Sequence, residues 1–206
     1  MAATRGRPRA FDREAALAAA TRLFWRHGYE ATSIGALTEA MNIRPPSLYA
    51  AFGDKKTLFE EVVTTYRRTR GAFMLRALDE EPDVRTGIAR MLREAAVEYT
   101  DPTVPPGCLV ISGAANCSPA NADVAARLRE LRDANLAVFE QRLGHAVAVG
   151  ELPDDTDVST LASYLAAVIQ GMSQRARDGA TTRELTALAE TAMLAVPGRV
   201  DEPADD

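Results

Sequence analysis

Several residue types are scarce in this chain of 206 residues, and each scarcity excludes a class of protein. It has only two cysteines and two histidines, which are too few for a disulfide framework or a paired Cys/His metal site. It has no run of 18 apolar residues, which argues against a membrane-spanning helix. No apolar stretch follows the basic N-terminal residues, so no secretory signal is predicted. We expect a protein of the reducing cytoplasm that needs neither metal nor cofactor.

Motifs of common enzymes are also missing. There is no Gly-x-Ser-x-Gly elbow and no phosphate-binding loop, both of which carry a recognisable spacing. A hydrolase that pairs Cys108 with His145 is the remaining enzyme hypothesis, and we expect no enzymatic activity.

Lysine is rare as well, since Lys55 and Lys56 are the only lysines among the 24 basic residues. The net charge of −5 is divided unevenly along the chain. Residues 1–70 hold 12 basic against 7 acidic side chains, and the remainder holds 12 against 22. Such asymmetry is expected when one part of a chain meets a polyanion. Chance clustering together with an acidic C-terminal tail is the alternative.

The first 42 residues have the pattern of two helices and a tight turn. Asp12 is a suitable N-cap for the first helix and Gly28 a suitable stop. Thr32 or Ser33 is expected to cap a short second helix. Asn42 then falls where a turn needs a residue that tolerates left-handed backbone angles.

A short third helix is expected to follow this turn. Pro45 and Pro46 suit a first helical turn, and Leu48 and Phe52 lie on one face of the helix. Asp54 is expected to cap a fourth helix. Three short helices with a tight turn between the second and third are typical of a DNA-reading module.

Two segments fix glycine, aromatic, cap and lysine positions in one register: FWRHGYEATSI at residues 24–34 and SLYAAFGDKKTLF at residues 47–59. Over about residues 11–58 the chain closely resembles the N-terminal domain of the tetracycline-repressor (TetR/AcrR) family of transcriptional regulators. The resemblance implies a helix-turn-helix DNA-binding domain, and Lys55 matches the family's phosphate-contacting lysine. Relatives often carry aromatic or His residues where this chain has Ala50 and Ala51, so thymine-methyl contacts or DNA shape are expected to do more of the discrimination.

The residues predicted to contact DNA lie at the starts of the second, third and fourth helices. They are Thr32, Ser33, Arg44, Pro45, Pro46, Ser47, Tyr49, Ala50 and Lys55. Packing of Tyr49 inside the domain is the alternative for that residue. The arginines at Arg5, Arg7 and Arg9 suggest either an arm that reaches the minor groove or a solvated tail.

Beyond residue 70 the pattern is again helical, which makes the predicted fold all-α. Helices are expected over residues 86–100, from Cys108 to about Cys117, along the segment that ends near Gly150, and after caps at Asp157 and Thr181. The predicted organisation is an arm (1–10), the DNA-binding domain (11–69), a helical effector-binding and dimerisation domain (70–197) and an acidic tail (198–206).

The resemblance implies that this second part senses a small molecule and forms a homodimer. Residues proposed to line an effector pocket, each also a candidate for ordinary core, are Met91, Ala95, Tyr99, Ile111, Asn116, Asn135, Phe139 and Leu143. The helix after Asp157 carries more apolar surface than one buried stripe needs, which favours a bundle between subunits over burial in one monomer. The predicted interface is Leu161, Leu165, Val168, Gly171, Met172, Leu185, Leu188 and Ala192.

Cys108 and Cys117 raise the hypothesis of a redox or electrophile sensor, with ordinary buried thiols as the alternative. Nine residues apart on one helix, they are expected to face roughly opposite ways and form no disulfide. Taken together, the sequence predicts a repressor that leaves a palindromic operator when an effector binds. A helical adaptor with a vestigial DNA-binding domain is the rival hypothesis.

Overall fold

The computed structural model describes residues 12–198, and within this range the chain is all-α, as predicted. Its α-helices are α1 (Arg13–Ala31), α2 (Ile34–Met41), α3 (Pro45–Phe52), α4 (Lys55–Arg68), α5 (Phe73–Glu80), α6 (Val84–Tyr99), α7 (Leu109–Ser112), α8 (Ala122–Ala148), α9 (Val158–Arg177) and α10 (Thr182–Ala192). Single 3₁₀ turns are η1 (Arg70–Ala72), η2 (Pro119–Asn121) and η3 (Met193–Ala195). None of these helices is both long and apolar enough to cross a membrane. The predicted arm with Arg5, Arg7 and Arg9 lies outside the described residues.

The first four helices begin and turn where the sequence predicts. The side chains of Asp12, Ser33 and Asp54 each accept a hydrogen bond from an amide in the first turn of the following helix, which satisfies donors that a helix start otherwise leaves free. Asn42 adopts left-handed angles, φ 53° and ψ 46°, so the chain reverses sharply between α2 and α3.

Gly28 interrupts α1 three residues before its end. Its φ of 77° and ψ of 171° are accessible to glycine and costly for other residues. The next amide, that of Tyr29, donates to the carbonyl oxygen of Gly113 at 2.7 Å, and a Cβ on Gly28 would lie 3.2 Å from that same oxygen. The end of α1 is therefore fixed closely against the loop after α7.

A small aromatic core joins α1 to α4. The ring of Phe59 meets those of Phe24 and Tyr29 edge-on, with centroid distances of 5.0 and 5.1 Å, an arrangement that aromatic pairs prefer. Leu48 and Phe52 of α3 are buried in the same region. These two residues set the rotation of α3 about its own axis.

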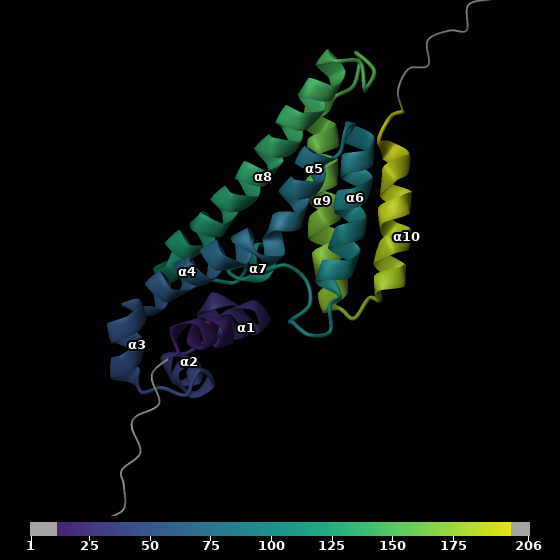
Figure 1. Cartoon of the computed structure of the whole chain (residues 1–206). Coiled ribbons are helices and arrows are strands. Elements are labelled where there is room, and N and C mark those ends of the chain that lie inside the picture. Colours follow the sequence, from purple (N-terminus) through teal and green to yellow (C-terminus); the bar gives the residue numbers. More distant parts are fainter. Residues whose placement is uncertain (1–11, 199–206) are drawn as a thin grey trace, which may run out of the picture.

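The second half of the chain is a bundle in which α6, α9 and α10 lie side by side, with α8 slanting past them from the first domain toward the far end of the molecule (Figure 1). Asp83 and Asp157 cap α6 and α9, and Thr181 with Glu184 forms the expected capping box of α10. The predicted caps at Asp157 and Thr181 are confirmed, and α6 begins two residues before the predicted start at residue 86.

The predicted helix from Cys108 to Cys117 is wrong, because α7 ends after one turn at Ser112. A continuing α-helix would use the carbonyl of Gly113 to accept the amide of Cys117. That carbonyl instead accepts the amide of Tyr29. The two cysteines are thus free thiols on separate segments rather than on opposite faces of one helix.

Candidate nucleic-acid interface

The start of α3 forms an exposed tip at the end of the molecule opposite α10 (Figure 1). Because Leu48 and Phe52 hold one face of α3 in the core, the other face is presented to solvent. Tyr49 is 51% exposed, so it does not pack inside the domain. The exposed residues that the sequence placed on this tip are Arg44, Pro45, Pro46, Ser47, Tyr49 and Ala50.

The tip offers side-chain groups rather than backbone amides. Pro45 and Pro46 have no N–H, and the amide of Ser47 already donates to the carbonyl of Arg44 at 2.9 Å. Hydroxyls at Ser47 and Tyr49 and the guanidinium of Arg44 are therefore the donors available at the tip. Hydroxyl and guanidinium groups are suited to phosphate and base edges alike.

In the structure the Thr32 side chain is buried and is not part of this surface, whereas the Ser33 side chain is exposed on it. Thr32 is 2% exposed, its hydroxyl donates to the carbonyl of Gly28 at 2.7 Å, and its amide donates to that of Tyr29. Ser33 takes the capping role instead, so the buried Thr32 side chain is not available to DNA. Ser33 is exposed at the start of α2.

The two neighbouring lysines contact different helices. The ammonium of Lys55 lies 4.3 Å from the centre of the Tyr29 ring, a cation–π contact that holds it at the junction of α1 and α4. Partial burial lowers the pKa of Lys55. Lys56 instead forms an ion pair with Asp123 at the start of α8. Only Lys55 is thus left for a phosphate.

Sequence reasoning missed the role of Arg13. Its guanidinium makes two bonds to the carboxylate of Glu61, at 2.6 and 2.7 Å, and lies 4.6 Å from the centre of the Phe52 ring. One side chain thereby links α1, α3 and α4. Nothing in the local sequence pattern pairs residues 48 positions apart, so no signal could have revealed it.

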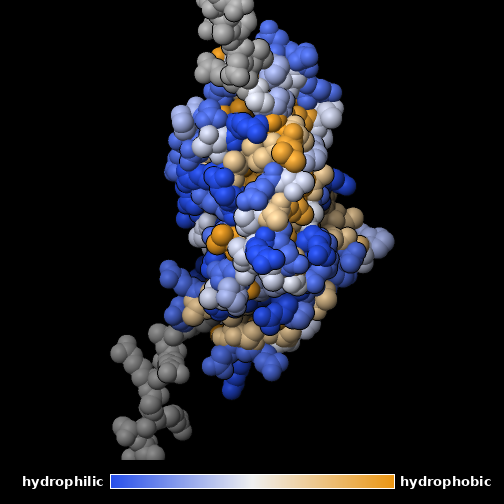
Figure 2. All heavy atoms as spheres, turned by 90° about the vertical axis from the view of Figure 1, so that its right-hand side faces the viewer, coloured by the Kyte–Doolittle hydropathy of each residue, from blue (hydrophilic) through white to orange (hydrophobic). Residues whose placement is uncertain are grey.

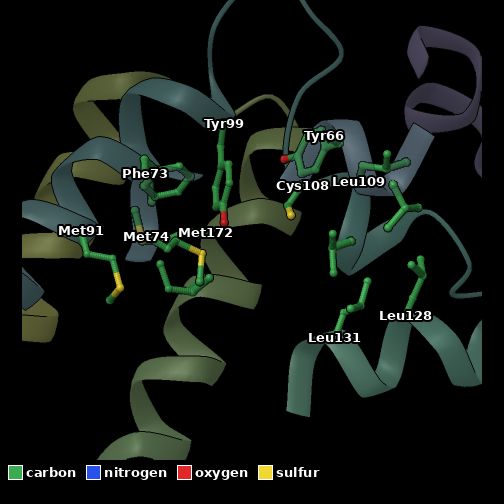
Figure 3. Close-up of a cluster of buried hydrophobic side chains, with 14 of the residues drawn as sticks. Tyr66, Phe73, Met74, Met91, Tyr99, Cys108, Leu109, Leu128, Leu131 and Met172 are labelled. Carbon is green, nitrogen blue, oxygen red and sulfur yellow. The ribbon is translucent and has the colours of Figure 1, made fainter. Parts of the chain in front are cut away.

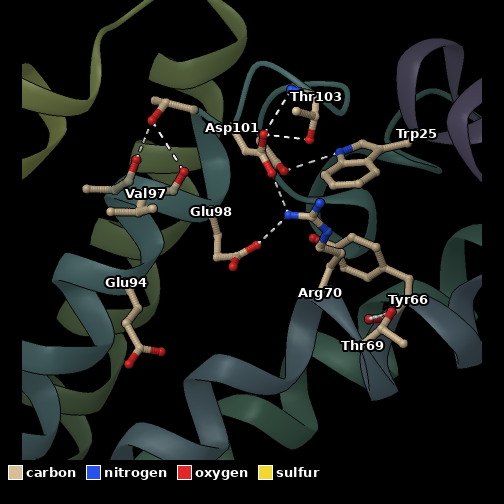
Figure 4. Close-up of polar contacts among 12 residues, drawn as sticks. Trp25, Tyr66, Thr69, Arg70, Glu94, Val97, Glu98, Asp101 and Thr103 are labelled. Atoms are coloured by element: carbon tan, nitrogen blue, oxygen red, sulfur yellow. Dashed lines mark hydrogen bonds and ion pairs between the residues drawn. The ribbon is translucent and has the colours of Figure 1, made fainter.

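Polar contacts attach the first four helices to the rest of the chain. The indole N–H of Trp25 donates to the carbonyl of Gly107 at 3.2 Å, and Arg127 of α8 lies 3.5 Å from Glu60 of α4. Arg70, just after α4, binds Glu98 at 3.1 Å and Asp101 at 2.6 Å, at the end of α6 (Figure 4). The α4 helix is therefore connected to α8 near its start and to α6 just beyond its end.

Asp101 is the most strongly perturbed carboxylate of this junction. The hydroxyl and amide of Thr103 and the guanidinium of Arg70 lower the pKa of Asp101 to about 2. The carboxylate is therefore charged at all physiological pH values, and the contact beyond the end of α4 does not depend on pH in that range.

Two neighbouring cavities lie where α4, α5, α7 and α8 meet. The larger is about 250 Å³ and the smaller about 30 Å³. Of the predicted pocket residues, Tyr99 and Asn135 line the larger cavity, and Asn135, Ile111 and Phe139 line the smaller one.

The remaining predicted pocket residues lie elsewhere. Three of them, Met91, Ala95 and Leu143, are packed in the core and line neither cavity. Asn116 is exposed and lines a separate hollow beside Gly28. Periodicity identifies the buried faces of helices, but it does not tell which buried residue borders a void.

The predicted dimer residues divide in a similar way. Five of them are buried within this one chain and offer little surface to a partner: Leu161, Leu165, Met172, Leu185 and Ala192. Val168 and Leu188 are half-buried and Gly171 is exposed. Hydrophobic residues form a broken strip on the side of the molecule that carries α10 (Figure 2).

The short α3 helix follows a tight turn, is anchored by the buried Leu48 and Phe52 and exposes its first turn. This arrangement defines a helix-turn-helix protein. The family model of the TetR family of bacterial regulatory proteins matches residues 16–62, and that of a tetracyclin repressor-like C-terminal domain matches residues 70–192. The chain belongs to the TetR family of transcriptional regulators, which are regulators and not enzymes.

Three relatives illustrate the similarity over nearly the whole chain. The transcriptional repressor ComR of Escherichia coli is 38% identical over 94% of this chain and 93% of its own length. The repressor BdcR of the same species is 30% identical over 96% and 95%. A cysteine-substituted form of the TetR-family regulator CifR, solved in complex with 26-bp double-strand operator DNA, is 42% identical, with a TM-score of 0.88 over 93% of this chain and 100% of that one.

Proposed function

We propose that this protein is a homodimeric repressor that binds a palindromic operator and leaves it when a small molecule occupies the cavity at the end of α4. One observation carries the proposal: α4 has Lys55 at its start and the cavity residues Tyr66, Arg67 and Arg68 at its end. A rigid helix of 14 residues, about 21 Å long at 1.5 Å per residue, connects the two.

The DNA-binding part of the proposal rests on the exposed α3 tip. Ser47, Tyr49 and Arg44 face solvent together, and Lys55 and the start of α2 flank them. A short helix with this arrangement fits the major groove while its neighbours contact the phosphates. The relative solved with operator DNA supports the same use of this domain.

A second copy of the chain is proposed to cover the outer face of α9 and α10. Tyr164 is 36% and Leu194 84% exposed, Val168 lies one helical turn after Tyr164 on α9, and Leu188 is half-buried on α10. A Cβ on Gly171 would meet no atom within 4 Å in this chain, so a partner helix can approach closely there. This outer face replaces the buried residues that the sequence suggested.

Glutamate at both Val168 and Leu188 is expected to weaken dimerisation at least about 100-fold, or roughly 2.7 kcal/mol, because unpaired charges would be buried between subunits. Sedimentation velocity across a concentration series measures this. The matched control is Val149→Glu, since Val149 is 52% exposed and follows α8 rather than lying on α9 or α10. Equal self-association of the double variant and the control would refute the proposed interface.

The proposed response to an effector follows from the connections of α4. A ligand between the end of α4 and α8 would shift that end, while the Lys56–Asp123 and Glu60–Arg127 ion pairs transmit the shift near its start. In a dimer the two α3 tips must match half-sites about one helical turn, or a multiple of it, apart. A small pivot of each domain is therefore enough to break the fit.

Selection of random DNA duplexes with the purified full chain tests the proposal. We expect enrichment of an inverted repeat whose half-site centres are about 10 bp apart or a multiple of that. Anisotropy of the labelled duplex then allows a screen of small molecules for release. Selection without any preferred sequence would contradict the operator-binding proposal, and release by no compound of any charge class would contradict the response.

A further inference from the structure

The charged side chains that line the larger cavity are all basic. Arg67 and Arg68 line its edge, and no acidic residue is among its lining residues. Both arginines are exposed, and neither forms an ion pair within residues 12–198. The smaller cavity repeats the pattern, with Arg132 and no carboxylate. In a chain whose net charge is −5, two adjoining cavities with three arginines and no acid favour an anionic occupant.

A buried polar group lies deeper, on the border of the larger cavity. The Tyr99 side chain is 1% exposed, and its hydroxyl makes no hydrogen bond of good geometry to a described residue, with only the weakly bonding Cys108 thiol beside it. Figure 3 shows this hydroxyl pointing into the space between Met172 and Cys108, next to Met74. Buried hydroxyls almost always have a good partner, and a thiol is a weak one, so this hydroxyl is free to donate to an oxygen of a bound group.

Met74 and Cys108 line both cavities and separate them. Methionine is flexible and changes rotamer readily. Movement of the Met74 side chain would join the two spaces and enlarge the cavity that the arginines and Tyr99 line. Apolar surface from Phe73, Leu75 and Val110 lines the same cavity.

We infer that the effector is a small carboxylic acid with an apolar, ring-sized body and a second oxygen at its far end. Its carboxylate meets Arg67 and Arg68, and its far oxygen accepts a hydrogen bond from Tyr99. A volume of about 250 Å³ corresponds to about eight water molecules of about 30 Å³ each, which limits the ligand to roughly ten non-hydrogen atoms. The inference rests on the proposed function, since it names the ligand class of that same cavity.

Calorimetric titration of the full chain with three probes tests the inference. The probes are 4-hydroxybenzoate, benzoate and the neutral 4-hydroxybenzamide. We expect 4-hydroxybenzoate to bind at least tenfold more tightly than either of the others and to release the selected operator duplex. Equal binding of the amide and the acid, or no binding of either acid, would overturn the inference.

Substitutions test which side chains contact each end of the ligand. The double variant R67A/R68A is expected to lose at least tenfold in affinity for both acids, whereas the control Arg93→Ala, an exposed arginine outside the cavity lining, is expected to change nothing. Tyr99→Phe is expected to lower affinity for 4-hydroxybenzoate to that of benzoate and to leave benzoate unaffected. Unchanged acid binding in R67A/R68A would overturn the placement of the carboxylate.

The two proposals fail in distinguishable ways. Operator binding by the parent protein is measured before any probe is added. If the protein binds its operator and is released by neutral or cationic compounds but by no acid, the ligand class is wrong and the ligand-responsive repressor stands. If no operator is bound, the proposed function itself is wrong.

Discussion

Replacement of Lys55 by alanine is expected to weaken operator binding by about tenfold and to reduce the salt slope of binding by about one unit, the value for one lost phosphate contact. The Tyr29 ring holds the Lys55 ammonium at the junction of α1 and α4, so this side chain loses little conformational freedom when it binds DNA. Sequence-independent phosphate contacts contribute much of the affinity for DNA. The loss is therefore expected on operator and random duplexes alike.

The neighbouring lysine provides the matched control. Lys56→Ala removes the same charge from the chain, but this side chain is paired with Asp123 of α8 rather than free for DNA. Fluorescence anisotropy at four or more salt concentrations gives both slopes. If the two variants lose affinity equally, net charge rather than the placement of Lys55 governs binding, and its site assignment is lost.

Alanine at Gly107 is expected to cause the largest loss of stability, about 3 kcal/mol. Gly107 has a φ of +78°, and an added Cβ would lie 2.7 Å from the carbonyl oxygen and 2.9 Å from the hydroxyl of Ser173. Left-handed angles cost a non-glycine residue about 1–2 kcal/mol, and overpacking adds about 1–3 kcal/mol. For a chain of this size the melting temperature should fall by roughly 6–12 °C.

Alanine at a second glycine serves as a control. It distinguishes the strain specific to Gly107 from the general effect of replacing a glycine. Gly144 lies inside α8, where a Cβ would meet nothing within 4 Å, so Gly144→Ala is expected to stabilise the chain by about 1 kcal/mol. Differential scanning calorimetry of both variants measures the difference. A Gly107→Ala variant that melts at the parent temperature would show that the loop adjusts freely around Ser173.

Local rules predicted most of the DNA-binding domain. The caps at Asp12, Ser33 and Asp54, and the turn at Asn42, each depend on one residue and its immediate neighbours, so the sequence was sufficient to place them. The exposed α3 tip follows from the same local pattern, because Leu48 and Phe52 alone fix which face is buried. The sequence left the cap of α2 open between Thr32 and Ser33, because that choice depends on the path of the chain before them, which buries Thr32.

Contacts between distant segments could not be predicted. The length of α7 depends on the bond from Tyr29 to Gly113, which no periodicity reveals. The α5 helix was not predicted either, although it buries Phe73 and Met74. It has no side-chain cap and no proline at its start, so a short periodic signal alone marks it. Because these two residues border the cavities, the sequence identified only part of the candidate effector site.

The two lysines are the only side-chain amines in the chain, and they are the first two residues of α4. Any enzyme or reagent that acylates lysine side chains therefore has just two targets here, one held over the Tyr29 ring and one paired with Asp123 of α8. Acylation of Lys55 would remove the positive charge proposed to meet the duplex, and acylation of Lys56 would break the bond to Asp123. The same modification would therefore weaken DNA binding when it occurs at Lys55, and would loosen the contact between α4 and α8 when it occurs at Lys56.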